Sequence, residues 1–291
     1  MVVLVTLVWV VEVRFSEAWG DAVHLAYAGL AWALVTAMAA LAPMEGRTPR
    51  AYQSVLYVAS FALAVAVLAN LAQLLGADSI TSSGAATWVF AVLAALAFAF
   101  TTRRNSAAST LLGAISGGIA VLSFFDWALN VDGVATFRWI LLALVAIYAV
   151  AAVGQRDRRF RHGVALIDAA GLATLAISLT FAGGLIFGSL LGHRTAAWGW
   201  ELLIVAVGFG LIAYSSVDRE PGPAYLGVLN LVAFAVITSA GVSGRGATLL
   251  GWPLVLAVAA AVLLVIGLRP TTPAPPPPDV DEPPAPPLPL R

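Results

Sequence analysis

The longest hydrophobic run of the chain extends from Gly163 to Gly192 and sets the strongest limit on its fold. As a helix this run would be about 45 Å long, which exceeds the roughly 30 Å hydrocarbon core of a bilayer. Gly184, Gly188 and Gly192 recur every four residues, so they share one helix face on which a neighbouring backbone can come close. The run predicts a membrane helix that tilts, kinks or emerges at its ends and packs through this glycine face.

The composition excludes a soluble fold. Of the 291 residues, 61% are hydrophobic and 10% are charged, and the mean hydropathy is +0.94, whereas soluble domains carry about 25% charged residues. The chain also contains no lysine and no cysteine. Lysine Schiff bases, lysine-dependent phosphate loops, thiol catalysis and thiolate metal sites are therefore excluded.

The other hydrophobic runs predict an all-α fold. Nine runs are long and apolar enough to be membrane helices, and helices are required because lipid cannot satisfy an open backbone. The runs cover residues 22–44, 51–76, 85–102, 108–129, 138–154, 163–192, 197–216, 224–242 and 248–268. We expect a polytopic transmembrane helix bundle over residues 22–268, after a short apolar segment and outer loop (1–21) and before a proline-rich tail (269–291).

The first eleven residues are apolar but too few for a full span. Glu12 and Arg14 follow directly. A signal peptide is a poor interpretation, because no basic region precedes the run and no cleavage site follows it. Two interpretations stay open: a short tenth span, or the remnant of a longer one.

The arginines predict the orientation of the bundle. Eleven of the fifteen lie in the loops after the odd-numbered expected spans or in the tail, and four lie on the opposite side. Because positive charge favours the cytoplasmic side, we expect a bacterial-type inner membrane protein with residues 15–21 outside and the tail in the cytoplasm. Six tryptophans near the expected outer boundary are typical of an interfacial aromatic belt. These are Trp19, Trp88, Trp127, Trp139, Trp198 and Trp200.

The C-terminal tail is rich in proline. Eleven of the sixteen prolines lie in residues 270–291, a composition that excludes a helix and favours an extended, disordered polyproline segment. Residues 286–291 fit the P-x-x-P-x-R pattern that SH3-type grooves bind. A solvated spacer is the simpler interpretation, and docking of a protein partner is the alternative.

Acidic residues near helix ends are the first functional candidates. Asp168 lies five residues into the long run, where its ionised carboxylate must face protein or water because lipid would cost about 3 kcal/mol at the bilayer centre. It is either a proton or cation site in a transport path or a headgroup-level acid neutralised by nearby arginines. Glu201 and Asp126 are expected at the outer end, in either an acidic mouth that concentrates cations or a solvated rim paired with arginine.

Amides, small residues and histidines complete the candidates. Asn70 and Gln73 stand at i and i+3 in the second expected span, where they either bond to a neighbouring helix or contact a solute. Gly113 and Gly117 form a second small-residue face for helix packing. The histidines and acids form no zinc motif, so we expect no cofactor and no metal. We expect ordinary interfacial histidines, rather than haem ligands, at His24, His162 and His193.

These features favour transport over other membrane functions. Polar groups on helices, glycine faces and short connections are typical of a transporter or permease-like protein for a small solute, in which Asp168 or Glu201 binds a proton or cation. The alternative is a non-catalytic scaffold or accessory subunit whose tail recruits a protein. A membrane-embedded enzyme for lipid-linked substrates comes third, because no acid pair or histidine dyad has useful spacing. No basic patch indicates nucleic-acid binding.

Overall fold

The computed structural model describes residues 2–15, 18–42, 51–77, 79–131, 133–186 and 196–241, and within these ranges it contains nine helices and no strand. The helices are α1 (Val2–Arg14), α2 (Asp21–Leu41), α3 (Ala51–Leu74), α4 (Ser83–Arg104), α5 (Ala107–Leu129), α6 (Val134–Arg156), α7 (Phe160–Ile186), α8 (Trp198–Asp218) and α9 (Pro221–Gly241). The expected all-α class is confirmed.

The helices follow the hydrophobic runs closely. Eight of them, α2 to α9, are long and apolar enough to cross a membrane, and each overlaps one of the first eight expected spans. The long helix α7 begins at Phe160, three residues before the hydrophobic run. The ninth expected span, 248–268, and the proline-rich tail lie outside the described residues.

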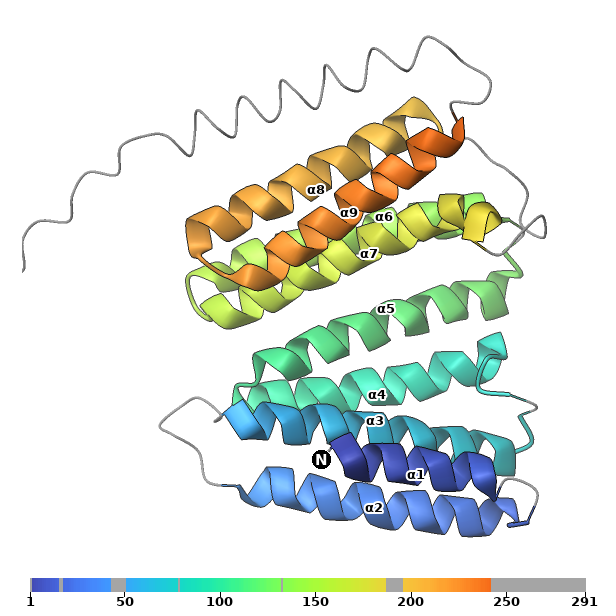
Figure 1. The fold of residues 1–291 in the computed structure, drawn as a ribbon. Coiled ribbons are helices and arrows are strands. Elements are labelled where there is room, and N and C mark those ends of the chain that lie inside the picture. The colour runs from blue at the N-terminus through green and yellow to red at the C-terminus, as the bar shows by residue number, and fades with distance from the viewer. Residues whose placement is uncertain are drawn as a thin grey trace, which may run out of the picture. The chain divides into compact units, whose positions relative to one another are not determined.

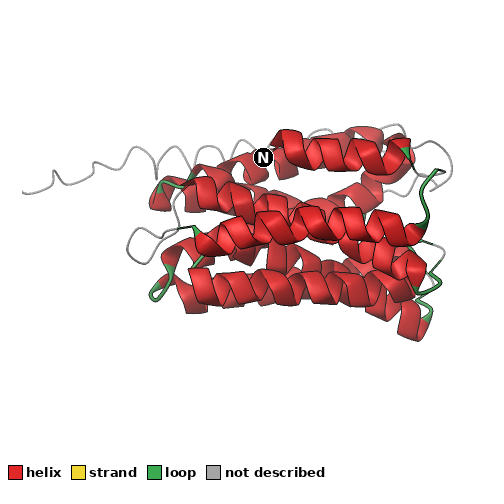
Figure 2. Cartoon of the chain, turned by 90° about the horizontal axis from the view of Figure 1, so that it is seen from below, coloured by secondary structure: helices red, strands yellow, loops and turns green. Residues whose placement is uncertain are grey.

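Helix pairing sets the architecture of the bundle. Consecutive helices pack as the hairpins α2–α3, α4–α5, α6–α7 and α8–α9. Odd-numbered helices also pack on one another, from α1 to α3, α5, α7 and α9 in turn. Figure 1 shows the hairpins and Figure 2 shows helix axes that are roughly aligned. Since chain direction alternates, the odd helices form a row of helices that run the same way.

Helix α7 lies at the centre of the group formed by α5 to α9. It packs against α5, α6, α8 and α9, and 56% of its most apolar window is buried, compared with 44% for α3, the next highest. Small residues allow this, because Ala169, Ala170 and Ala173 are buried and let neighbouring backbones come close. The hydrophobic run that dominates the sequence is therefore also the most enclosed of the described spans.

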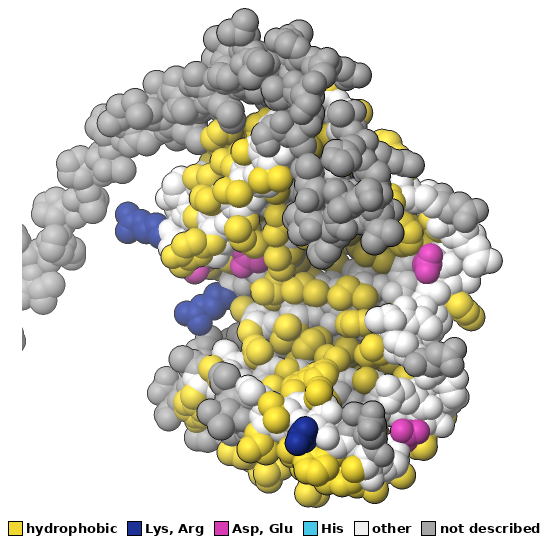
Figure 3. Space-filling model, turned by 45° about the vertical axis from the view of Figure 1, so that its right-hand side comes forward, with side chains coloured by type: hydrophobic (Ala, Val, Ile, Leu, Met, Phe, Trp, Pro, Cys, Tyr) yellow, Lys and Arg dark blue, Asp and Glu magenta, His cyan; other side chains and the backbone are white. Residues whose placement is uncertain are grey.

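The described exterior is hydrophobic. Large apolar side chains such as Leu30, Ile147, Val153 and Val217 are more than half exposed, and Figure 3 shows apolar atoms covering most of the described surface on one face. An apolar exterior of this extent is costly in water and favourable in lipid.

Two tight turns position the functional residues described below. Asn105 ends α4 with φ 52° and Arg219 ends α8 with φ 57°, both in the left-handed region. The hydroxyl of Ser106 then caps α5 by accepting from the Ser109 amide at 3.3 Å. With these left-handed residues, each connection reverses the chain within two residues.

Helix α1 is shorter than a membrane span. Its 13 residues reach about 20 Å. It packs against α2 and α3 through Val8, which is 2% exposed in a cluster with Val35 and Leu63. Over the described residues, α1 is a short helix packed into the bundle, and both interpretations of residues 1–11 stay predictions.

Candidate functional site

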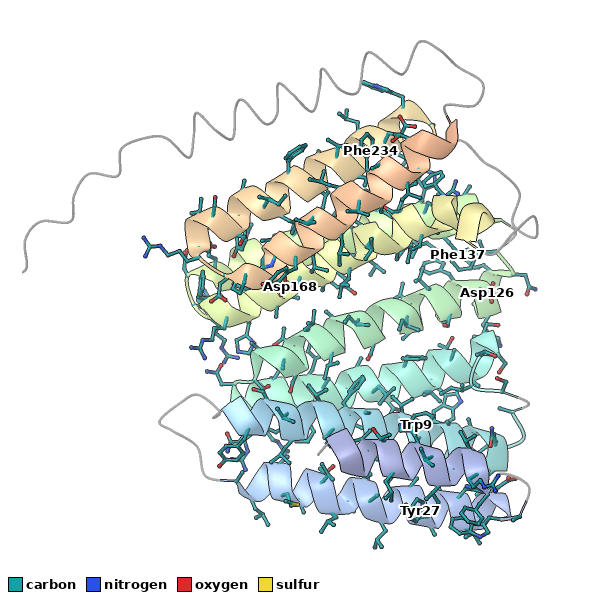
Figure 4. The ribbon with its side chains drawn as sticks, viewed as in Figure 1. Trp9, Tyr27, Asp126, Phe137, Asp168 and Phe234 are labelled. Atoms are coloured by element: carbon teal, nitrogen blue, oxygen red, sulfur yellow. The ribbon has the colours of Figure 1, made fainter. Side chains whose placement is uncertain are left out.

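A cavity lies beside Asp168 at the arginine-rich end of the bundle, where the α4–α5, α6–α7 and α8–α9 connections meet. Its volume is about 340 Å³. Three charged side chains line it: Arg161 and Asp168 from α7, and Glu220 from the α8–α9 turn. Figure 4 shows Asp168 at this end and Asp126 at the opposite end.

The Asp168 carboxylate is half-buried, and the described residues do not satisfy both of its oxygens with hydrogen bonds. Its Oδ1 atom is buried and has no hydrogen-bond partner among the described residues. Gly222 lies against the carboxylate, since a Cβ at position 222 would stand 3.0 Å from Oδ2 and 3.3 Å from Oδ1. A buried carboxylate oxygen without a donor costs free energy. A proton or a bound cation at this carboxylate would offset that cost.

The α8–α9 turn that carries Glu220 is held in place by its neighbours. The Ser215 hydroxyl donates to the Glu220 carbonyl oxygen at 2.5 Å. Arg156, at the end of α6, pairs with Asp218 at 2.7 Å, and its guanidinium lies 5.6 Å from the Tyr214 ring centroid. The turn is therefore fixed to α6 while its acid faces the cavity.

A buried polar network joins the α4–α5 turn to α7 next to the cavity. His162 is 4% exposed. Its Nε2 donates to the Asn105 Oδ1 at 2.8 Å, because an amide oxygen can only accept, and its Nδ1 lies 2.5 Å from the Thr110 hydroxyl. The Thr110 hydroxyl also lies 3.3 Å from that of Thr101. Both imidazole nitrogens are thus satisfied, and the network fixes the first turn of α7.

Sequence reasoning treated His162 as an ordinary interfacial histidine and missed this network. Its members are separated by 52 and 57 positions along the chain, so spacing could not connect them. The available signal was the group Ser106, Ser109 and Thr110 at the start of α5, which places hydroxyls on one helix face.

Replacing Thr110 by valine is expected to destabilise the bundle by about 1 kcal/mol, because it removes the hydroxyl partner of a buried imidazole. Thr102→Val is the matched control, since Thr102 is exposed and bonds only to Ala99 in its own helix. Its effect should stay within about 0.5 kcal/mol. Equilibrium unfolding in mixed detergent micelles measures both, and equal effects would show that the Thr110 contact is not stabilising.

Glu201 and Asp126 are not brought together. Each is partly buried, but they belong to α8 and α5, which do not pack on each other. Arg138 is 8% exposed on α6, where it donates to the Thr180 hydroxyl at 2.7 Å and lies 3.5 Å from the Phe181 ring centroid. The described residues therefore do not gather these two acids into one acidic mouth.

Asn70 takes part in a cluster that includes an acid not singled out in the sequence. Its side-chain amide donates to Glu12 Oε1 at 3.2 Å, and Glu12 Oε2 lies 2.7 Å from His24 Nδ1. This cluster joins α1, α2 and α3. Gln73, three residues along α3, is exposed and separate from it. Asn70 therefore bonds to a neighbouring helix, α1.

The glycine candidates differ in where they lie. Gly113 and Gly117 face α4, where an added Cβ would stand 3.1 Å from the Phe98 ring and 4.0 Å from Ala94 Cβ. Gly184 lies in the last turn of α7, whereas Gly188 and Gly192 lie outside the described residues. The sequence did not predict the close approach of Gly208 on α8 to Gly227 on α9, where an added Cβ at position 227 would stand 2.7 Å from the Gly208 carbonyl oxygen.

Comparison with protein-family models, with curated proteins and with solved structures finds no match. Over the described residues, no group of three or more histidines and acids is placed to hold a metal ion. The helix lengths, the apolar exterior and the internal polar clusters define the class: the chain is a multi-pass helical membrane protein.

Proposed function

We propose that this membrane protein is a transporter or permease-like protein for a small solute, in which Asp168 binds a proton or another cation. The observation that carries the proposal is the half-buried Asp168 carboxylate, which lines a cavity of about 340 Å³ with one oxygen unpartnered among the described residues. Ionisable groups inside membrane bundles are costly and mark ion or solute paths. Asp168 is preferred to Glu201 because it lines this cavity.

The size and the walls of the cavity support a small solute. A volume of about 340 Å³ lies at the lower end of the range for small-molecule sites. Helix α7 contributes Asp168 and packs on four other helices. Small buried side chains, among them Ala169, Ala170 and Ala173, would let α7 shift against its neighbours. Such a shift is the movement that we propose for exposing Asp168 to the other side.

The arginine asymmetry supports an orientation for this path. The cavity lies at the end that carries most of the arginines, so by the positive-inside rule it would open to the cytoplasm from a bacterial-type inner membrane. The proline-rich tail would lie on the same side. Its part in the function, as a spacer or as a docking segment, is a separate proposal that the described residues do not address.

Uptake by proteoliposomes tests the proposal. Vesicles holding the protein receive a mixture of amines, amino acids, sugars and organic acids under an imposed proton gradient, and mass spectrometry identifies what accumulates. We expect at least one solute to accumulate above the level of protein-free vesicles, and Asp168→Asn to abolish this accumulation. Asp157→Asn is the matched control, because Asp157 is an exposed acid at the same end that does not line the cavity.

Two outcomes would contradict the proposal. Accumulation that Asp168→Asn leaves at the original level would exclude Asp168 as the coupling site. Absence of accumulation for every solute, under gradients of either direction, would favour the scaffold alternative instead.

A further inference from the structure

The charges that line the Asp168 cavity favour a positively charged ligand. Two carboxylates, Asp168 and Glu220, face one guanidinium, that of Arg161, and α5 adds no charged residue to the lining. Arg156 and Asp218, close by, neutralise each other as an ion pair. Negative charge is therefore in excess among the side chains that line the cavity, and this excess attracts cations.

The remaining walls of the cavity are apolar. Ala107, Ala108 and Leu111 come from α5, and Val164 and Ala165 come from α7. A bare inorganic cation needs several oxygen ligands to replace its water, and these side chains supply none. An organic cation meets both surfaces, because its charged group faces the carboxylates while its hydrocarbon part covers the apolar wall.

The Asp168 carboxylate and Gly222 beside it indicate where the charged group of the ligand would bind. Asp168 Oδ1 has an unfilled acceptor position among the described residues. An ammonium group has several N–H donors and forms charge-assisted hydrogen bonds to carboxylates. Gly222 offers no side chain that could cover this carboxylate.

We propose that the solute bound at this site is a small organic ammonium ion, with its ammonium group on Asp168 and Glu220 and its hydrocarbon part against α5 and the first turns of α7. This inference rests on the proposed transport function and specifies its substrate class. It assigns to Glu220 a share in binding that sequence reasoning did not give it.

A single introduced thiol can report on the cavity, because the chain has no cysteine. Ala108→Cys places this thiol in the cavity wall, and Ser82→Cys, exposed at the start of α4, is the reference position. Labelling rates are measured with trimethylammonioethyl and sulfonatoethyl methanethiosulfonates, which carry opposite charge. We expect the ratio of cationic to anionic rates to be about tenfold higher at position 108 than at position 82.

Protection from labelling then tests binding. The probes are butylammonium, butanol and butyrate, which are similar in size and differ in charge, with sodium ion as the inorganic cation. We expect saturating butylammonium to slow labelling of Ala108→Cys at least about fivefold, and the other three to have little effect. Adding Asp168→Asn should weaken butylammonium binding by about tenfold, which corresponds to about 1.4 kcal/mol. Adding Asp157→Asn should not change it.

The outcomes distinguish the organic ammonium assignment from the proposed transport function. Equal protection by butanol or by sodium, or protection that survives Asp168→Asn, would overturn the organic ammonium assignment. If the uptake experiment still depends on Asp168 in that case, the transport proposal stands with another cation. If uptake also fails to depend on Asp168, both proposals are wrong.

Discussion

Replacing Gly227 by leucine is expected to force α8 away from α9 and to destabilise the protein by about 3 kcal/mol. A Cβ at position 227 would stand 2.7 Å from the carbonyl oxygen of Gly208 and 2.8 Å from Ile212 Cγ1. The first of these contacts is to backbone, so no side-chain rotation can relieve it. Since Glu220 and Gly222 lie where these two helices join, the displacement should also disturb the Asp168 cavity.

The neighbouring glycine on α8 supplies the control for this experiment. Gly210 is exposed, and a Cβ there would meet nothing within 4 Å, so Gly210→Leu should be neutral or slightly stabilising through its better helix propensity. Unfolding by SDS in mixed micelles compares the two variants at equal change in side-chain size. If both variants unfold at the same SDS fraction as the original protein, this result would contradict the close packing of α8 on α9.

Most of the helical architecture could be predicted from hydropathy, because every membrane helix must be a long apolar run. Hydropathy predicts the bounds of a helix less accurately where the helix ends in charged residues. Helix α7 includes Arg161 and His162, which the hydrophobic run excludes, since arginine can extend to the interface and His162 is satisfied by Asn105 and Thr110. A hydropathy window ends at such residues although the helix continues.

The candidate site was predictable only in part. Asp168 is recognisable as an acid inside an apolar run, whereas its role as a cation site is a proposal that only an experiment can test. Glu220 gives no such signal, because it stands in a short polar turn, and only packing of α9 on α7 brings it to the cavity. The contact of Gly208 with Gly227 is likewise made by single glycines on two helices, whereas sequence periodicity detects glycines repeated on one helix.

The second large effect concerns Asp168 itself: Asp168→Asn should abolish cation-dependent charge movement. A carboxylate that binds a cation inside the membrane protein moves charge when the cation arrives from solution. An amide of nearly the same shape keeps the packing against Gly222 but cannot take up a proton or pair with a cation. The change therefore removes the charge while it disturbs the structure little.

Transient current from proteoliposomes adsorbed on a solid-supported electrode is the most direct measurement of this claim. Rapid exchange to acidic, sodium or butylammonium solution should produce a transient with the original protein in at least one case. Asp168→Asn should reduce that transient at least about tenfold, and Asp157→Asn should preserve it. A transient of undiminished size in Asp168→Asn, or none in the original protein with any of the three cations, would contradict the assignment of Asp168 as a cation site.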